Sequence, residues 1–154
     1  MPLIDGQAYR ITTLWSGLAI DVRDSSTDDD APVVQNPVNA PNPSQHWVAR
    51  AHLNNQFELV NVNSGKSLSV YYGKTDPGTT LVQYDSHGWN DQLWAVNFLG
   101  DTALTPIITA LSNSLVIDVP GATVAWDTQL ELWPPNGGGS AVAGNQDFIF
   151  TPLN

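Results

Sequence analysis

Short stretches in which apolar residues occupy every second position recur along the whole chain. Each follows a turn sequence rich in Ser, Gly or Asn, in the blocks 16–22, 64–70 and 113–119. A period of two predicts a β-strand with one face toward a core, so Leu18, Ile20 and Val22 should share a buried face. A further strand is expected before each turn, at 9–14, 57–62 and 107–111.

A second signature, Gln followed two residues later by an aromatic residue, closes each third of the chain. It reads Gln45-His46-Trp47, Gln92-Leu93-Trp94 and, in a weaker form, Gln146-Asp147-Phe148. An apolar run precedes each signature, at 32–34, 80–84 and 129–133. A short apolar strand flanks each signature, at 48, 94–98 and 148–150. With four short strands in each third, the chain should hold about twelve strands of ordinary length.

The threefold repetition predicts an all-β fold. Strands that close around a threefold axis leave no free sheet edges, and each third completes its core only with the other two. The expected architecture is a β-trefoil of three four-stranded lobes with pseudo-threefold symmetry. We expect one domain over residues 1–154, with lobes at about 7–50, 51–98 and 99–154. A sandwich or jelly roll would lack the threefold similarity. The signature aromatics should lie in the core, namely Trp47, Trp94 and Phe148.

Charge and composition narrow the range of partners. The 154 residues include 15 acidic and 5 basic ones, a formal net charge of −10. Such a chain repels phosphate backbones, which argues against nucleic acid and anionic membranes as partners. It contains no Cys, and no apolar run approaches the roughly 18 residues of a membrane span. The first residues lack the basic and apolar regions of a secretory signal, so we expect a cytoplasmic protein without membrane insertion.

The sequence shows no catalytic or metal-binding motif. The His residues are scattered, and the run Asp28-Asp29-Asp30 lacks the ligand spacing of a calcium loop, which favours a solvated loop. Asp21 and Asp118 belong to different repeats, which argues against the paired carboxylates of a glycosidase. No nucleophile elbow or phosphate-cradling Gly loop is found either. We therefore expect no enzyme activity, no cofactor and no metal.

The block Ile20-Asp21-Val22-Arg23-Asp24 and the Gln-x-aromatic signatures resemble those of the ricin B-chain-like β-trefoil lectins. The resemblance covers about residues 7–152, and the whole chain is most similar to the small cytosolic lectins of mushrooms. It implies non-catalytic binding of glycans or glycoconjugates of the galactose and N-acetylgalactosamine type, with a role in fungal defence.

In that family a sugar site combines an Asp after the turn, an aromatic residue after the third apolar run and an Asn before the signature. The third lobe matches in full, with Asp118 as acceptor, Trp133 as stacking platform and Asn145 as donor. The first lobe keeps Asp21 as a second candidate acceptor. There Asn36 occupies the aromatic position, where it could still offer hydrogen bonds, and Ser44 replaces the amide.

The second lobe carries Ser69, Tyr84 and Asp91 at the three site positions, so it should be silent for the family's ligand. Other aromatic residues of this lobe form a surface that could serve another contact, namely Tyr71, Tyr72, His87 and Trp89.

Two other functions stay open at this stage. Mushroom β-trefoils of similar length also inhibit proteases through exposed loops, and an inert storage or scaffold protein is the third reading. Retention on immobilised galactose would separate a lectin from an inhibitor. Because a single shallow site binds a monosaccharide at about millimolar strength, useful avidity would require several sites or a homodimer.

Overall fold

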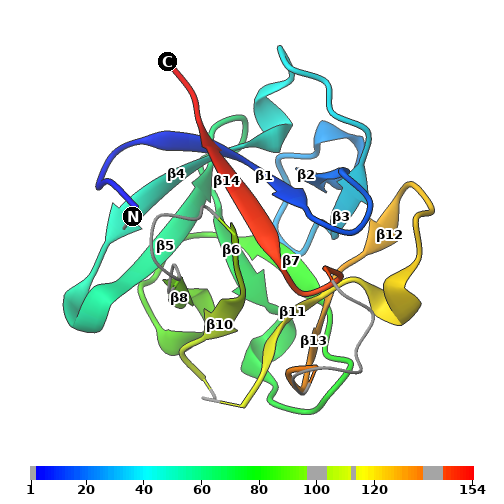
Figure 1. Cartoon of the computed structure of the whole chain (residues 1–154). Coiled ribbons are helices and arrows are strands. Elements are labelled where there is room, and N and C mark those ends of the chain that lie inside the picture. Colours follow the sequence, from blue (N-terminus) through cyan, green and yellow to red (C-terminus); the bar gives the residue numbers. More distant parts are fainter. Residues whose placement is uncertain (1–2, 97–103, 112–113, 137–143) are drawn as a thin grey trace.

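The chain forms β-strands and single 3-10 turns within residues 3–96, 104–111, 114–136 and 144–154, which the computed structural model describes (Figure 1). The first lobe contains β1 (Ala8–Thr13), β2 (Ala19–Val22), β3 (Val33–Asn36) and β4 (His46–Ala51). The second lobe contains β5 (Gln56–Asn61), β6 (Ser67–Val70), β7 (Leu81–Tyr84) and β8 (Trp94–Val96). The third lobe contains β9 (Leu104–Thr105), β10 (Ile107–Thr109), β11 (Val116–Asp118), β12 (Thr128–Gln129), β13 (Glu131–Trp133) and β14 (Phe148–Pro152). The all-β prediction is confirmed, and no helix in these ranges is long and apolar enough to cross a membrane.

The third lobe has two strands more than the repeat pattern predicts. β9 is an additional short strand, and the apolar run 129–133 is divided between β12 and β13. The division arises because the run changes partner: β12 pairs with β3 of the first lobe, whereas β13 pairs with β11 of its own lobe. The predicted strand 94–98 is described only as far as Val96, and residue 113 of the third predicted turn also lies outside the described residues.

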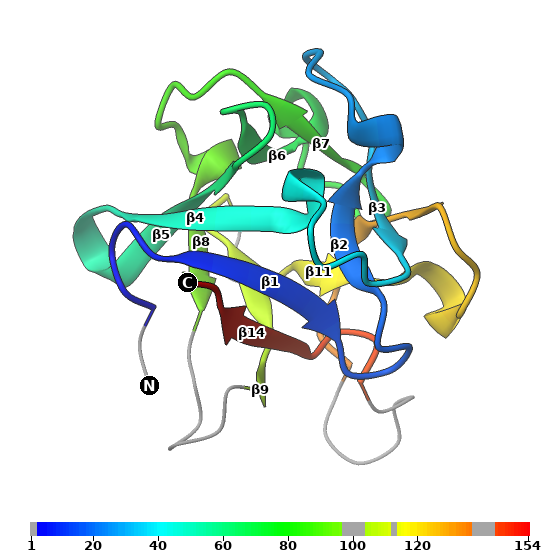
Figure 2. The ribbon, with the colours of Figure 1, turned by 90° about the horizontal axis from the view of Figure 1, so that it is seen from above.

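One set of strands closes into a ring. β14, β1, β4, β5, β8 and β10 are hydrogen-bonded to one another in this order, all antiparallel. β9, which directly precedes β10 in the chain, pairs with β14 and so completes the ring. Figure 2 shows β4, β1 and β14 side by side on one wall of this ring. Closure leaves these strands with partners on both sides and removes exposed edges.

The strands outside the ring, apart from β12, form one hairpin in each lobe. The hairpins β2–β3, β6–β7 and β11–β13 have the same register, so the pairs Asp21↔Val34, Ser69↔Val82 and Asp118↔Glu131 are equivalent. The same register makes Asn36, Tyr84 and Trp133 equivalent, as the repeats predict. The three lobes can therefore be compared position by position.

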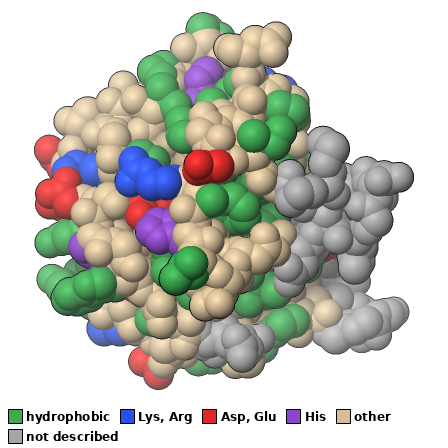
Figure 3. All heavy atoms as spheres, turned by 90° about the vertical axis from the view of Figure 1, so that its left-hand side faces the viewer, with side chains coloured by type: hydrophobic (Ala, Val, Ile, Leu, Met, Phe, Trp, Pro, Cys, Tyr) green, Lys and Arg blue, Asp and Glu red, His purple; other side chains and the backbone are tan. Residues whose placement is uncertain are grey.

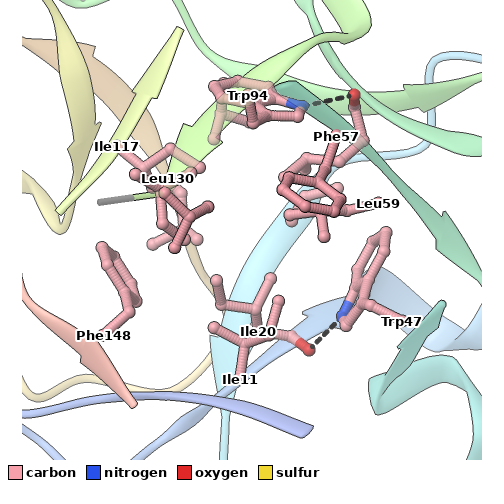
Figure 4. Close-up of a cluster of buried hydrophobic side chains, with 14 of the residues drawn as sticks. Ile11, Ile20, Trp47, Phe57, Leu59, Trp94, Ile117, Leu130 and Phe148 are labelled. Atoms are coloured by element: carbon pink, nitrogen blue, oxygen red, sulfur yellow. Dashed lines mark hydrogen bonds between the residues drawn. The ribbon is translucent and has the colours of Figure 1, made fainter. Parts of the chain in front are cut away.

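The three signature aromatics meet in the core, as expected (Figure 4). Trp47, Trp94 and Phe148 are completely buried. The indole nitrogen of Trp47 donates to the carbonyl of Ile20 at 3.1 Å, and that of Trp94 donates to the carbonyl of Leu68 at 3.1 Å. Each Trp thus fills the core and ties the ring to the hairpin of its own lobe.

The strand β2 is buried on both faces, whereas the alternation predicted one buried face that included Leu18. Ile20 and Val22 are buried in the core, but Leu18 lies before the strand and is only partly buried. Asp21, on the opposite face, is also buried because polar side chains surround it there. Both faces of the strand are therefore covered, one by apolar and one by polar side chains.

Ionic side chains on the surface are dispersed. Among the described residues on the face in Figure 3, Lys and Arg side chains lie among acidic and uncharged ones and form no continuous stripe. The acidic run 28–30 is exposed. Its Asp29 pairs with Lys66, with 2.9 Å between Oδ1 and Nζ, and this contact lowers the pKa of Asp29.

Replacement of Trp47 tests the importance of the signature aromatics. Trp47→Ala should lower the free energy of unfolding by about 3–5 kcal/mol, because it leaves a large cavity and removes the bond to the hairpin. Trp126→Ala is the matched control, since Trp126 is 70% exposed, and should cost less than about 0.5 kcal/mol. Urea unfolding measures both values. Equal effects of the two substitutions would contradict the core assignment.

Candidate functional site

A pocket with a volume of about 480 Å³ lies beside the hairpin β11–β13 of the third lobe. The turn Pro120–Ala122 and the residues just before β14 form its other walls. Its polar and aromatic lining consists of Asp118, Glu131, Trp133, Asn136 and Asn145. All three residues that the sequence singles out in this lobe therefore border one pocket.

Asp118 is held firmly in this pocket. Its Oδ2 accepts hydrogen bonds from Nε2 of Gln146 at 2.8 Å and from Nδ2 of Asn145 at 3.2 Å. Only 3% of the residue's surface is exposed. The remaining contact of the carboxyl group is with Glu131, directly opposite on β13. Asp118 is thus a preorganised acceptor whose position is set by the signature Gln and the residue before it.

Glu131 was not identified from the sequence, yet it shares the pocket with Asp118. Burial raises the pKa of Glu131 to about 7, and the hydrogen bond and negative charge of Asp118 add to this rise. Burial also raises the pKa of Asp118, although its hydrogen bonds from Gln146, Glu131 and Asn145 act in the opposite direction. The two carboxyl groups therefore compete for ionisation, as close like-charged groups do.

Asn145 lines the pocket, and its side chain is hydrogen-bonded within the protein. Its Nδ2 donates to Asp118 and, at 3.3 Å, to the carbonyl of Val119, while its Oδ1 accepts from Nδ2 of Asn136 at 2.8 Å. The role of Asn145 as a direct donor to a sugar stays a prediction. Asn136, which is exposed, also borders the pocket.

Gly144, directly before Asn145, packs against the first lobe. Gly144 has a φ of +103°, and a Cβ there would lie 3.1 Å from the backbone nitrogen of Trp15 and 3.2 Å from the side chain of Leu14. Only Gly fits this close approach without a shift of its neighbours. The indole of Trp15 also donates to the carbonyl of Ala122, which lines the pocket. Contacts between lobes thus shape the site.

The candidate residues of the first lobe are engaged with one another. Asp21 is buried, and its carboxylate accepts from Oγ of Ser44 at 2.5 Å and from the amides of Gln45 and Asn36, each at 3.2 Å. The Asn36 side chain also accepts from the backbone of Asp127 at 3.0 Å. Asn36 therefore acts as a link to the third lobe.

In the second lobe, Ser69 stands where the third lobe has Asp118, and Asp91 stands where it has Asn145. Ser69 donates to the carbonyl of Ser67 at 2.8 Å and accepts from Gln92 at 3.1 Å, so its hydroxyl is used within the lobe. Tyr84 is 39% exposed, close to the 44% of its equivalent Trp133. A second pocket, with a volume of about 510 Å³, lies next to these residues.

Alignment of the three repeats would have identified Glu131 as an unusual residue at its position. The equivalent positions in the other lobes carry Val34 and Val82, both buried and apolar. An acidic residue at the third position breaks the repeat at a site flanked by Leu130 and Leu132. The hydrogen bonds of Asn145 to Asp118, Val119 and Asn136, by contrast, depend on tertiary contacts that the sequence pattern does not contain.

Comparison with known proteins identifies the family. A family model described as "Ricin-type beta-trefoil lectin domain-like" matches residues 3–84 and 43–133. The chain belongs to this family. The resemblance seen in the sequence is thereby confirmed. A comparison with curated protein sequences finds no match.

Several solved structures share the fold of this chain. The designed threefold-symmetric protein ThreeFoil is similar at 27% identity and a TM-score of 0.86, over 95% of this chain and 99% of its own. The exo-β-1,3-galactanase of Clostridium thermocellum is similar at 28% identity and a TM-score of 0.85, over 98% of this chain but only 31% of its own. The ricin B-like lectin of Macrolepiota procera, solved in complex with lactose, is similar at 19% identity and a TM-score of 0.80, over 99% of this chain and 100% of its own. The β-trefoil fold is thus confirmed.

The raised pKa of Glu131 predicts a specific pH dependence of stability. An acid whose pKa rises on folding binds its proton more tightly in the folded state than in the unfolded state. The contribution of protonated Glu131 to the free energy of unfolding is therefore fully present below its unfolded pKa of about 4.5, and it is lost as the pH rises through about 7. Glu131→Gln should therefore stabilise the protein more, relative to the unmodified chain, at pH 8 than at pH 4. Urea unfolding at both pH values measures this. A difference in unfolding free energy that does not change with pH would contradict the assignment.

Proposed function

We propose that the protein binds glycans of the galactose and N-acetylgalactosamine type in the pocket of the third lobe, without transforming them. The observation that supports this most strongly is the convergence of Asp118 and Trp133 on one pocket. A buried carboxylate and a half-exposed indole ring are the two groups that a pyranose requires for recognition.

Each group has a distinct part in this proposal. The Asp118 carboxylate accepts hydrogen bonds from neighbouring sugar hydroxyls, because its position is fixed by Gln146 and Asn145. Trp133 offers its ring to the apolar C–H face of the sugar. Asn136 supplies a polar group at the pocket, and Asn145 holds Asp118.

Related structures favour the galactose class. The Macrolepiota procera lectin was solved with lactose, a galactoside, and the Clostridium thermocellum enzyme is a galactanase. The family match supports carbohydrate binding in general. Neither the match nor the described pockets favour the alternative of a protease inhibitor.

The geometry of the carboxyl groups supports binding without catalysis. Glycosidases place two carboxyl groups about 5–5.5 Å or 6.5–9.5 Å apart, so that they flank the bond to be cleaved. Asp118 and Glu131 instead lie directly opposite each other on paired strands, where Asp118 contributes to the raised pKa of Glu131. A cross-strand pair projects from one face of a hairpin rather than from two sides of a bound glycosidic bond, which supports recognition without cleavage.

The other lobes differ in what they offer a galactose-type ligand. In the first lobe, Asn36 stands at the position of Trp133 and gives no stacking face, although Asp21, like Asp118, is held by neighbouring side chains. A ligand there would lack the aromatic contact. We therefore assign the main site to the third lobe, and avidity for a multivalent glycoconjugate to the presence of more than one copy of the chain.

Substitutions of Asp118 and Trp133 test the proposal. Asp118→Asn should weaken binding of lactose or N-acetylgalactosamine by at least about tenfold, since it removes a charged acceptor while keeping the side-chain shape. Trp133→Ala should weaken it by about tenfold through loss of the stacking face. Isothermal titration calorimetry, or retention on immobilised galactose, measures both effects.

Two variants serve as controls for this experiment. Trp126→Ala removes an exposed Trp outside the pocket and should leave affinity unchanged. Asp21→Asn should have a small effect. Full binding by Asp118→Asn together with loss of binding by Asp21→Asn would show that the first lobe carries the site and would overturn the proposal.

A further inference from the structure

The pocket of the second lobe has an aromatic lining that the fold does not require. Its volume is about 510 Å³, and Tyr72, Tyr84 and Trp89 all border it. Tyr72 is 75% exposed and Trp89 is 72% exposed. Large rings that leave most of their surface in water, gathered around one hollow, mark a binding surface rather than a part of the core.

Tyr72 adopts a backbone conformation that its residue type disfavours. It has a φ of 52° in the turn Tyr71–Gly73, whereas the equivalent positions of the other lobes hold Asp24 at 55° and Gly121 at 60°. Gly and Asp tolerate this left-handed region, but a bulky aromatic residue is strained there. Strain of this kind tends to persist at functional sites, and here it places a ring at the mouth of the pocket.

The rings of Tyr84, His87 and Trp89 form a row of contacts at the pocket. The rings of Tyr84 and His87 have centroids 6.2 Å apart, and those of His87 and Trp89 are 4.9 Å apart. The turn that carries Tyr72 packs directly against Asp91, because a Cβ on Gly73 would lie 3.7 Å from the Cβ of Asp91. The pocket is thus bordered by aromatic faces with a carboxylate close by.

The polar groups that line the pocket include two carboxylates. The Ser69 hydroxyl is used within the lobe, and the position equivalent to Asn145 holds Asp91. Asp30 adds a second carboxylate to the lining. None of the described residues that line the pocket is Lys or Arg. Among these lining residues, the titratable base next to Asp91 is His87, with 3.7 Å between His87 Nε2 and Asp91 Oδ2.

We infer that this pocket binds an organic cation that carries a quaternary or other alkylammonium group. Aromatic faces attract such a group through their π-electrons, and carboxylates beside them complement its charge. A neutral sugar would miss the charged acceptor at the position of Ser69 that Asp118 provides in the third lobe. The inference is independent of the proposed glycan site, because it rests on other residues in another lobe.

Choline and its neutral isostere 3,3-dimethylbutan-1-ol test the role of charge. They have nearly the same shape, so a charge-selective pocket should bind choline at least about tenfold more tightly. Titrations at constant ionic strength, followed through the indole N–H signal of Trp89 in ¹H–¹⁵N NMR spectra and assigned with Trp89→Phe, measure both affinities. Equal affinities would overturn the inference, as would a Trp89 signal that shifts with galactose but not with choline.

Variants identify the groups responsible. Asp91→Asn should remove most of the preference for choline, and it should fold, because the third lobe has Asn145 at the equivalent position. Asp76→Asn removes an exposed carboxylate of the same lobe outside the pocket and should leave choline affinity within about twofold. Asp118→Asn should also leave it unchanged, which separates this test from that of the glycan site. Unaltered choline binding by Asp91→Asn would contradict the inference.

The source of the cation can be determined with the same variants. Co-sedimentation with phosphatidylcholine vesicles but not with phosphatidylglycerol vesicles, lost in Asp91→Asn, would identify a lipid headgroup. Choline binding without vesicle binding would identify a free cation. Both results support the ammonium site, whereas co-sedimentation that Asp91→Asn does not reduce would count against it.

Discussion

In every lobe a buried glutamine side chain joins three segments of the chain. The amide nitrogens of Gln45, Gln92 and Gln146 donate to the side chain at the acid position of the hairpin, and to a backbone carbonyl just after the hairpin. Their carbonyl oxygens accept from a backbone N–H of that same loop. Two residues later comes the aromatic side chain that fills the core. Because the polar atoms of a buried amide need hydrogen-bond partners, this Gln connects the core, the hairpin and the loop that follows the hairpin.

The same framework therefore supports three different surfaces. Where the hairpin carries Asp21, neighbouring polar side chains surround the carboxylate. Where the hairpin carries Asp118, the carboxylate borders a pocket together with Trp133 and with Glu131, whose ionisation is coupled to that of Asp118. Where the hairpin carries Ser69, the carboxylate of this lobe is instead that of Asp91, and the surface is rich in aromatic rings. The fold tolerates these changes because the signature Gln accepts either a carboxylate or a hydroxyl as its partner.

The sequence was sufficient for those features that repeat. The period of two, the turns and the signature spacing predicted the strands, the buried Trp47 and Trp94, and the residues of the third-lobe site that come together. It was insufficient where tertiary contacts decide. The run 129–133 divides because β12 pairs with the first lobe, whereas β13 pairs within the third lobe. The Asn145 side chain bonds Asp118, and the Asn36 side chain accepts from the backbone of the third lobe. Glu131 was visible in principle, as the acidic residue in a place that is Val in the other repeats.

The central claim, that the third lobe holds the glycan site, can be tested through the indole N–H signals of the six Trp residues. These signals are resolved in ¹H–¹⁵N NMR spectra and can be assigned with single Trp→Phe variants. On titration with lactose, we expect a progressive shift of the Trp133 signal, while the signals of the buried Trp47 and Trp94 stay in place. An unchanged Trp133 signal at saturating lactose, with a shift of another exposed Trp instead, would contradict the claim.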